Sequence, residues 1–299
     1  MKPQRFSYCR PDTAAQAVAL LGAYGDEAKV LAGGQSLMPL LNLRLAGPQV
    51  LVDVSSMAEL RGIEVDDECV TIGAATTHQE ILEGGSLGSP VMALLAKTAG
   101  FIGHWPIRTR GTIGGSLAHA DPAAEWCTLA LALGARIRTS GESGRRLVPA
   151  DEMFLGPFTS ALEDTELLTA VEFPSDVAGY GVREFAMRQG DFATVVVAVA
   201  IRSDREGAVA VRVAAGGIDV RAIRIPEGEA VLRDALRERP VRRGAAVDSL
   251  ARSAGAACSS AVRPLADNHA SSAYRRHLVG ELVAQAAADA MMMVGDGSV

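Results

Sequence analysis

The sequence predicts an α+β protein of two domains. It has 299 residues, of which 48% are hydrophobic and 21% charged, a composition typical of folded globular chains. At roughly 150 residues per domain, this length predicts about two domains with separate cores. The pattern of the sequence changes once along the chain. In the first part, short strand-like runs alternate with helical segments, and in the second part, long strand-like runs precede alanine-rich helical segments. We expect the boundary in the Pro174–Gly181 break.

The first part mixes helices and strands. Asp12 can cap a helix over Ala14–Tyr24 that ends at Gly25, and a strand over Lys29–Ala32 runs directly into Gly33 and Gly34. Apolar runs predict further strands at Val50–Val54, Val70–Ala74, Ala135–Thr139 and Glu166–Phe173, and further helices at Thr77–Leu82, Val91–Phe101 and Trp126–Leu133.

The second part predicts a sheet backed by helices. Strands are expected at Arg183–Met187, Phe192–Ile201 and Val209–Ala215, and helices at Glu227–Arg237, Ala245–Ala257 and Ser271–Met293. We expect Met291–Val299 to be a mobile tail.

Charge and cysteine content narrow the function classes. Lys and Arg total 29 against 35 Asp and Glu, a net charge of -6, and the basic residues are scattered, which argues against a nucleic-acid partner. The longest apolar run, Ala193–Ile201, is too short to span a membrane. The 4 cysteines contain no CxxC pair and are typical of isolated thiols in a reducing compartment, so we expect a cytoplasmic protein.

Two glycine pairs are candidates for binding an anion. The chain lacks GxGxxG and GxxxxGK[ST], but Gly33-Gly34 and Gly114-Gly115 are each followed by hydroxyl or amide side chains. Residues without a Cβ allow backbone N–H groups to converge on a diphosphate. The alternative interpretation is that both pairs form ordinary tight turns.

Other chemistries have weaker signals. His104, His119, Asp121 and Glu125 are the only cluster of potential metal ligands, and without an HExxH motif we expect no metal in this chain. Ser36 and Ser116 lie in segments without a recognisable nucleophile elbow, so no nucleophilic or other catalytic residue is predicted.

Longer segments around both glycine pairs resemble a known family. Leu31–Leu37 (LAGGQSL), followed by Pro39–Leu45 and Leu51–Val54, resembles the first flavin-binding motif in the FAD subunit of molybdenum hydroxylases. Ile102–Glu125 resembles the second motif, as found in the medium subunit of carbon monoxide dehydrogenase and in the xanthine dehydrogenase family. Shorter matches follow at Gly156–Phe158, Glu166–Leu168, Arg188–Ala193 and His269–Leu278.

This resemblance implies a specific domain organisation. Residues 1–176 would form a two-lobed FAD-binding domain of the PCMH type, which is similar to vanillyl-alcohol oxidase. Residues 177–290 would form a sheet-and-helix domain of the carbon monoxide dehydrogenase flavoprotein type, and residues 291–299 would form the tail.

The resemblance also implies a set of FAD-binding residues. The first glycine loop would wrap the diphosphate and the second would close on it, while Phe192 would cover one flavin face and Arg188 would lie near the pyrimidine edge. An isolated Phe before an apolar run, such as Phe192, is otherwise typical of a core residue. The full set is Leu31, Ala32, Gly33, Gly34, Gln35, Ser36, Leu37, Ile102, Thr112, Gly114, Gly115, Ser116, Glu125, Leu168, Arg188 and Phe192.

By the same resemblance, the chain would be an electron-transfer subunit. It would take electrons from [2Fe-2S] clusters of a small subunit and pass them to an external acceptor, while a large subunit carries the molybdenum cofactor, in a dimer of heterotrimers. The alternatives are a stand-alone FAD-dependent oxidoreductase of the same fold and a non-catalytic assembly protein. The substrate of the complex and the terminal acceptor do not follow from the sequence.

Overall fold

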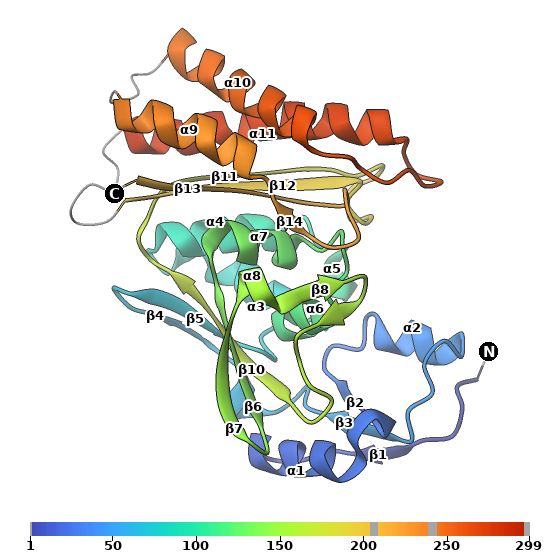
Figure 1. Ribbon diagram of the computed structural model, residues 1–299. Helices are drawn as coiled ribbons and strands as arrows, with labels where there is room; N and C mark the ends of the chain where they lie inside the picture. Colours follow the sequence, from blue (N-terminus) through green and yellow to red (C-terminus); the bar gives the residue numbers. More distant parts are fainter. Residues whose placement is uncertain (1, 204–208, 239–243, 296–299) are drawn as a thin grey trace.

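A computed structural model describes residues 2–203, 209–238 and 244–295. Its elements form a small N-terminal lobe, a central lobe and a C-terminal layer of sheet and helices (Figure 1). This arrangement confirms the predicted mixture of helices and strands. None of the helices within the described ranges is long and apolar enough to cross a bilayer.

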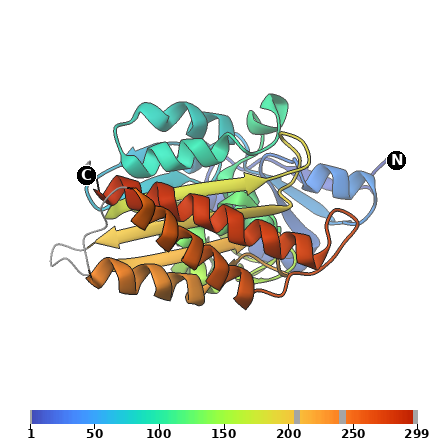
Figure 2. The same cartoon turned by 90° about the horizontal axis from the view of Figure 1, so that it is seen from above.

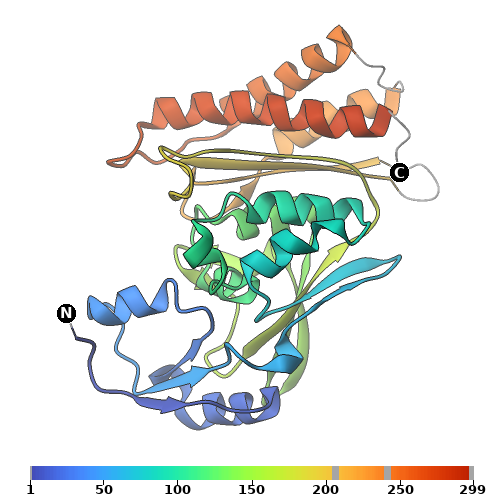
Figure 3. The same ribbon diagram turned by 180° about the vertical axis from the view of Figure 1, so that it is seen from behind.

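The N-terminal lobe is built on a three-stranded parallel sheet in the order β1-β3-β2. Its elements are β1 (Ser7–Cys9), α1 (Ala14–Tyr24), β2 (Ala28–Leu31), α2 (Leu37–Asn42) and β3 (Val50–Asp53). The side chain of Thr13 accepts a hydrogen bond from the N–H of Gln16, so Thr13 caps α1 and the expectation for Asp12 is wrong. Figure 3 shows α2 apart from the sheet, next to the loop that joins β2 to it.

The central lobe has a five-stranded antiparallel sheet in the order β4-β5-β10-β6-β7. The strands are β4 (Ile63–Val65), β5 (Cys69–Gly73), β6 (Arg136–Gly141), β7 (Gly144–Pro149) and β10 (Leu167–Pro174), with a separate hairpin of β8 (Phe154–Gly156) and β9 (Thr159–Ser160). Its helices are α3 (His78–Glu83), α4 (Pro90–Ala99), α5 (Trp105–Arg108), α6 (Ile113–His119), α7 (Glu125–Leu133) and α8 (Ala150–Met153).

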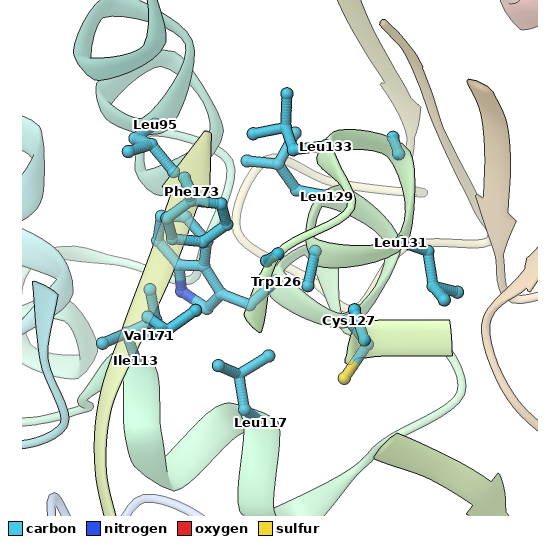
Figure 4. Close-up of a cluster of buried hydrophobic side chains, with 14 of the residues drawn as sticks. Leu95, Ile113, Leu117, Trp126, Cys127, Leu129, Leu131, Leu133, Val171 and Phe173 are labelled. Atoms are coloured by element: carbon cyan, nitrogen blue, oxygen red, sulfur yellow. The ribbon is translucent and has the colours of Figure 1, made fainter. Parts of the chain in front are cut away.

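Local sequence explains where the central helices begin and end. Thr77 and Glu80 form a capping box at the start of α3, and Ser89 caps α4 directly before Pro90. Helix α7 ends at Gly134, whose φ of 66° suits a residue without a Cβ. Trp126 of α7 is fully buried, and Figure 4 shows it surrounded by apolar side chains from α4, α6 and β10.

The C-terminal layer is an antiparallel sheet in the order β11-β12-β13-β14, covered by helices on its outer face (Figures 1 and 2). Its elements are β11 (Val177–Phe185), β12 (Val195–Ser203), β13 (Val209–Gly216), β14 (Ile223–Arg224), α9 (Pro226–Glu238), α10 (Ala245–Ala261) and α11 (Ser272–Gly295). The inner face packs on α4 and α7, so one apolar cluster joins the central lobe to this sheet.

Two expectations for this part need correction. Strand β11 begins at Val177, so the break between the two parts is shorter than the predicted Pro174–Gly181 segment. Helix α11 runs to Gly295 and Met291 is fully buried, so the prediction of a tail is wrong for residues 291–295. The last four residues lie outside the described ranges.

Candidate cofactor-binding site

A cavity of about 680 Å³ lies between the N-terminal lobe, the central lobe and the loop that joins β11 to β12. Cavities of about 300–1,000 Å³ are typical of sites for cofactors and drug-sized ligands. The following predicted site residues line it: Ala32, Gly33, Gly34, Gln35, Ser36, Leu37, Ile102, Thr112, Gly114, Gly115, Ser116, Glu125, Leu168 and Phe192. Segments more than 150 positions apart in the sequence therefore meet at one cavity.

The structure does not bring two predicted residues to this cavity. Leu31 lines a neighbouring cavity of about 420 Å³ on the side of the first glycine loop that faces Asp53 and Arg110. Arg188 is exposed and lines neither cavity. These placements do not support a direct cofactor contact for either side chain.

The first glycine loop follows β2 and has free hydrogen-bond donors. Gly34 has a φ of 71°, a left-handed conformation that favours glycine. In the described part of the chain, no acceptor is bonded to the backbone N–H groups of Gly33, Gly34, Gln35 and Ser36. Unpaired N–H groups that line a cavity can converge on an anion such as a phosphate.

The second glycine pair forms the first turn of α6, so the alternative interpretation as an ordinary tight turn is wrong for this pair. The N–H of Gly114 donates to the carbonyl of Ala74 at 3.0 Å, and that of Gly115 donates to Oγ1 of the N-cap residue Thr112 at 3.1 Å. These donors are satisfied within the protein. The pair therefore forms a wall of the cavity, and Ser116 adds a hydroxyl group there.

The two glycine segments, residues 33–36 and residues 110–116, are packed together through main-chain atoms. A Cβ on Gly33 would lie 2.1 Å from the carbonyl oxygen of Arg110, next to the second segment. A Cβ on Gly114 would lie 2.7 Å from the carbonyl oxygen of Ala74. Real Cβ atoms do not approach main-chain atoms so closely, so both positions require glycine for packing alone.

Behind the second segment lies a buried histidine that the sequence analysis did not single out. The Nε1–H of Trp126 donates to the ring Nδ1 of His78 at 3.1 Å. The main-chain N–H of His78 donates to the carbonyl of Gly111 at 3.0 Å. Burial, with a smaller effect of the charge of Arg108, lowers the pKa of His78 to about 3. His78 is therefore neutral at physiological pH and fixes the loop before α6.

An acidic region lines the cavity where α7 begins. Burial is the largest effect on Glu125 and raises its pKa to about 7; its own backbone N–H opposes this, and the charge of Asp121 adds to it. Asp121 also lines the cavity, as does His119, whose ring centroid lies 5.0 Å from that of Phe158. In the described residues no group of three or more His, Cys, Asp or Glu is placed to hold a metal ion.

The loop between β11 and β12 carries Phe192 to the cavity. Phe192 is 79% exposed, so the alternative interpretation as a core residue is wrong. The buried Arg275 of α11 holds the base of the loop by donating to the carbonyl of Thr194 at 2.7 Å and to Asp267 at 2.6 Å. At the tip, Gly190 (φ 84°) packs against His104.

Lys29, Asp164 and Glu166 also line the cavity, although none of them was among the predicted site residues. Lys29 and Asp164 form an ion pair at 3.4 Å, and Arg146 binds Glu166 at 2.5 Å. Lys29 is the first residue of the predicted strand Lys29–Ala32, and its charge was the available signal. The partner of Lys29, Asp164, lies between β9 and β10, 135 positions later, and no local pattern connects the two residues.

Two family models match the chain. The model described as "FAD binding domain in molybdopterin dehydrogenase" matches residues 4–176, and the one described as "CO dehydrogenase flavoprotein C-terminal domain" matches residues 181–290. The chain is 35% identical to the nicotine 6-hydroxylase medium subunit of Paenarthrobacter nicotinovorans over 283 residues, 95% of this chain and 96% of that protein. It is 37% identical to the carbon monoxide dehydrogenase medium chain of Hydrogenophaga pseudoflava over 238 residues, 78% of this chain and 81% of the other.

Solved structures agree with these matches. A chain of carbon monoxide dehydrogenase from Hydrogenophaga pseudoflava superposes with a TM-score of 0.86 at 34% identity, covering 98% of this chain and 99% of that one. A chain of quinoline 2-oxidoreductase from Pseudomonas putida 86 gives a TM-score of 0.84 at 31% identity, covering 99% of this chain and 100% of that one.

Proposed function

The chain belongs to the FAD-binding medium subunits of molybdenum hydroxylases and is an oxidoreductase subunit, and on that premise we propose that it carries electrons from [2Fe-2S] clusters in a small subunit to an external acceptor. One observation carries the proposal: the two glycine segments meet at one cavity, where the main-chain N–H groups of the first loop have no acceptor among the described residues. Such donors fit the diphosphate of FAD.

The residues fit the cofactor in distinct ways. We assign the diphosphate to the N–H groups of Gly33–Ser36, and a wall contact to Gly114–Ser116. Glu125 would bind hydroxyl groups of the cofactor, since its carboxylate lines the cavity and accepts hydrogen bonds. Phe192 would cover the flavin ring, because it is a large apolar side chain exposed at the cavity.

Bound FAD supplies the redox chemistry, because it can take up and release electrons in steps of one or two. The chain's own residues have a different task. They hold the cofactor, keep His78 neutral behind the loop and place Phe192 at the opening. We assign no acid or base catalysis to the chain.

We extend the proposal to the assembly. Relatives named medium subunit or medium chain are parts of larger complexes. We propose a large subunit with the molybdenum cofactor, a small iron–sulfur subunit and a dimer of heterotrimers, with residues 1–176 and 177–290 as the two domains. All 4 cysteines are free thiols, which supports a cytoplasmic location.

Two measurements test the proposal. The purified chain should show the visible spectrum of bound flavin, and adding reduced iron–sulfur subunit should bleach that spectrum. A colourless chain that does not bind added FAD would refute the flavin assignment. A flavin that stays oxidised with reduced partner present would refute the electron-transfer role alone.

A further inference from the structure

The loop that carries Phe192 to the cavity is held at its base by the first turn of α11. Residues 186–194 join β11 to β12, and Gly190, Asp191 and Phe192 line the cavity. In the described part of the chain, no main-chain hydrogen bond joins residues 186–193 to another element. The position of Phe192 therefore depends on packing at the tip of the loop and on the contacts at its base.

Two adjacent residues of α11 hold the two sides of that base. The guanidinium of Arg275 donates to the carbonyl of Thr194 at 2.7 Å and also to the carbonyl of Gly217. The ring of Tyr274 meets that of Phe185 edge-on, with centroids 5.9 Å apart, and the N–H of Thr194 donates to the carbonyl of Phe185 at 2.8 Å. The end of β11 and the start of β12 are therefore both attached to α11.

Arg275 is itself fixed in one orientation. Its side chain is buried, and its second terminal nitrogen donates to Oδ2 of Asp267 at 2.6 Å. The other carboxylate oxygen of Asp267 accepts the main-chain N–H groups of His269 at 2.9 Å and of Ala270 at 3.0 Å. Asp267 thus neutralises the buried charge, and the planar guanidinium can serve three oxygen atoms at once.

The same guanidinium connects the loop to the cavity wall. Gly217 lies so close to the loop that a Cβ on it would be 2.5 Å from the carbonyl oxygen of Thr194. The N–H of Gly217 donates to the carbonyl of Pro122 at 2.8 Å, and Pro122 directly follows Asp121, which lines the cavity. Arg275 therefore holds the base of the loop at a set distance from the wall.

We propose that Arg275 is a positioning residue that fixes Phe192 over the flavin and so sets how far small solutes reach the cofactor. This inference rests on the proposed binding of FAD. Arg275 does not line the cavity, so it acts through the loop. When the clamp formed by Tyr274, Arg275 and Asp267 is loosened, Phe192 should leave the flavin face open, while the first glycine loop still holds the diphosphate.

The first test measures the base of the loop in the apoprotein. Arg275→Lys keeps the charge but has one nitrogen in place of the two that bond to three oxygens. Hydrogen exchange of the Thr194 amide is compared with that of Val199, in the middle of the same strand. The ratio of the two rates should rise about tenfold, the factor that one hydrogen bond to a charged group is worth. Global destabilisation would speed both amides alike and leave the ratio unchanged.

Two further variants complete this test. Arg202→Lys is the matched control, because Arg202 makes two hydrogen bonds to Asp176, at 2.8 Å and 2.7 Å, toward the other end of β12, and it should keep the ratio of the unchanged protein. Asp267 is half exposed, so Asp267→Asn decides the outcome where Arg275→Lys does not fold. An unchanged ratio in the deciding variant overturns the proposal.

The second test asks whether the effect reaches the cofactor through Phe192. Iodide quenching of the fluorescence of bound FAD is measured for the unchanged protein, the deciding variant, Phe192→Ala and the double variant. The quenching constant of the deciding variant should rise toward that of Phe192→Ala, and the double variant should show no further rise. No rise, or an equal rise with and without Phe192, overturns the proposal. An unchanged protein that binds no FAD instead refutes the flavin assignment, and the exchange of Thr194 then decides the clamp by itself.

Discussion

Replacing Gly33 by Ala tests whether the two glycine segments hold each other in place. The new Cβ would lie 2.1 Å from the carbonyl oxygen of Arg110 and 2.6 Å from Cα of Gly111, which are both main-chain atoms. Ordinary contacts between heavy atoms are about 3.5–4.0 Å, so the two segments would have to separate by more than about 1 Å. Overpacking of this kind costs about 1–3 kcal/mol of folding free energy.

Two assays measure the consequences of Gly33→Ala. A loss of about 1–3 kcal/mol lowers the melting temperature by about 2–12 °C in a protein of this size class. Separation of the segments also moves the N–H groups that we assign to the diphosphate, and one lost hydrogen bond to a charged group is worth about 1.5–3 kcal/mol. The dissociation constant for FAD should therefore rise at least about tenfold. Thermal unfolding of the apoprotein and fluorescence titration with FAD give the two numbers.

Gly156→Ala is the matched control, because a Cβ at that position meets no atom within 4 Å. It should keep the melting temperature and the FAD affinity of the unchanged protein. If Gly33→Ala also keeps both values, the close approach of the two segments does not shape the site and our reasoning is refuted.

Three further changes test separate parts of the site. Trp126→Phe removes the donor to His78, so it should cost about 1–3 kcal/mol in urea unfolding, and an unchanged midpoint would contradict that hydrogen bond. Phe192→Ala should leave apoprotein stability within about 0.5 kcal/mol because the ring is exposed, yet alter the reduction potential of bound FAD; an unaltered potential would contradict the flavin contact. Burial raises the pKa of Asp267, but hydrogen bonds, led by that from Arg275, outweigh it and lower the pKa to about 2 from 3.8. Stability from this pair is present above pH 3.8 and lost as the pH falls through about 2; because Asp267 is half exposed we expect about 1 kcal/mol, and Asp267→Asn should remove this step from the acid-unfolding curve.

Sequence periodicity predicted the elements that have an apolar signal of their own. Strand β12 is buried along almost its whole length and reads as a continuous apolar run, and β13 and α10 were placed within a few residues. Strand β7, in contrast, was missed. It is an edge strand with Arg145 and Arg146 exposed, and it pairs on one side only, so its sequence carries little hydrophobic pattern.

The site was predicted where its residues follow one another along the chain. Most members of the predicted set belong to the two glycine segments, and these segments do meet at one cavity. The missed residues act through distant partners. His78 depends on Trp126, 48 positions away, and Arg275 depends on Thr194, 81 positions away.

The structure gives Gly33 and Gly114 a different reason for being glycine from the one expected from the sequence. From the sequence, the lack of a Cβ at Gly33 and Gly114 was expected to allow close approach of a diphosphate. The structure shows instead that both Cβ positions are occupied by carbonyl groups of the chain, whereas Gly34 is required for its left-handed φ. Because contacts within the protein set the spacing of the two segments, we expect the site to be formed before FAD binds. Binding then loses less conformational entropy, and the free N–H groups of the first loop can contribute to affinity rather than to ordering the loop.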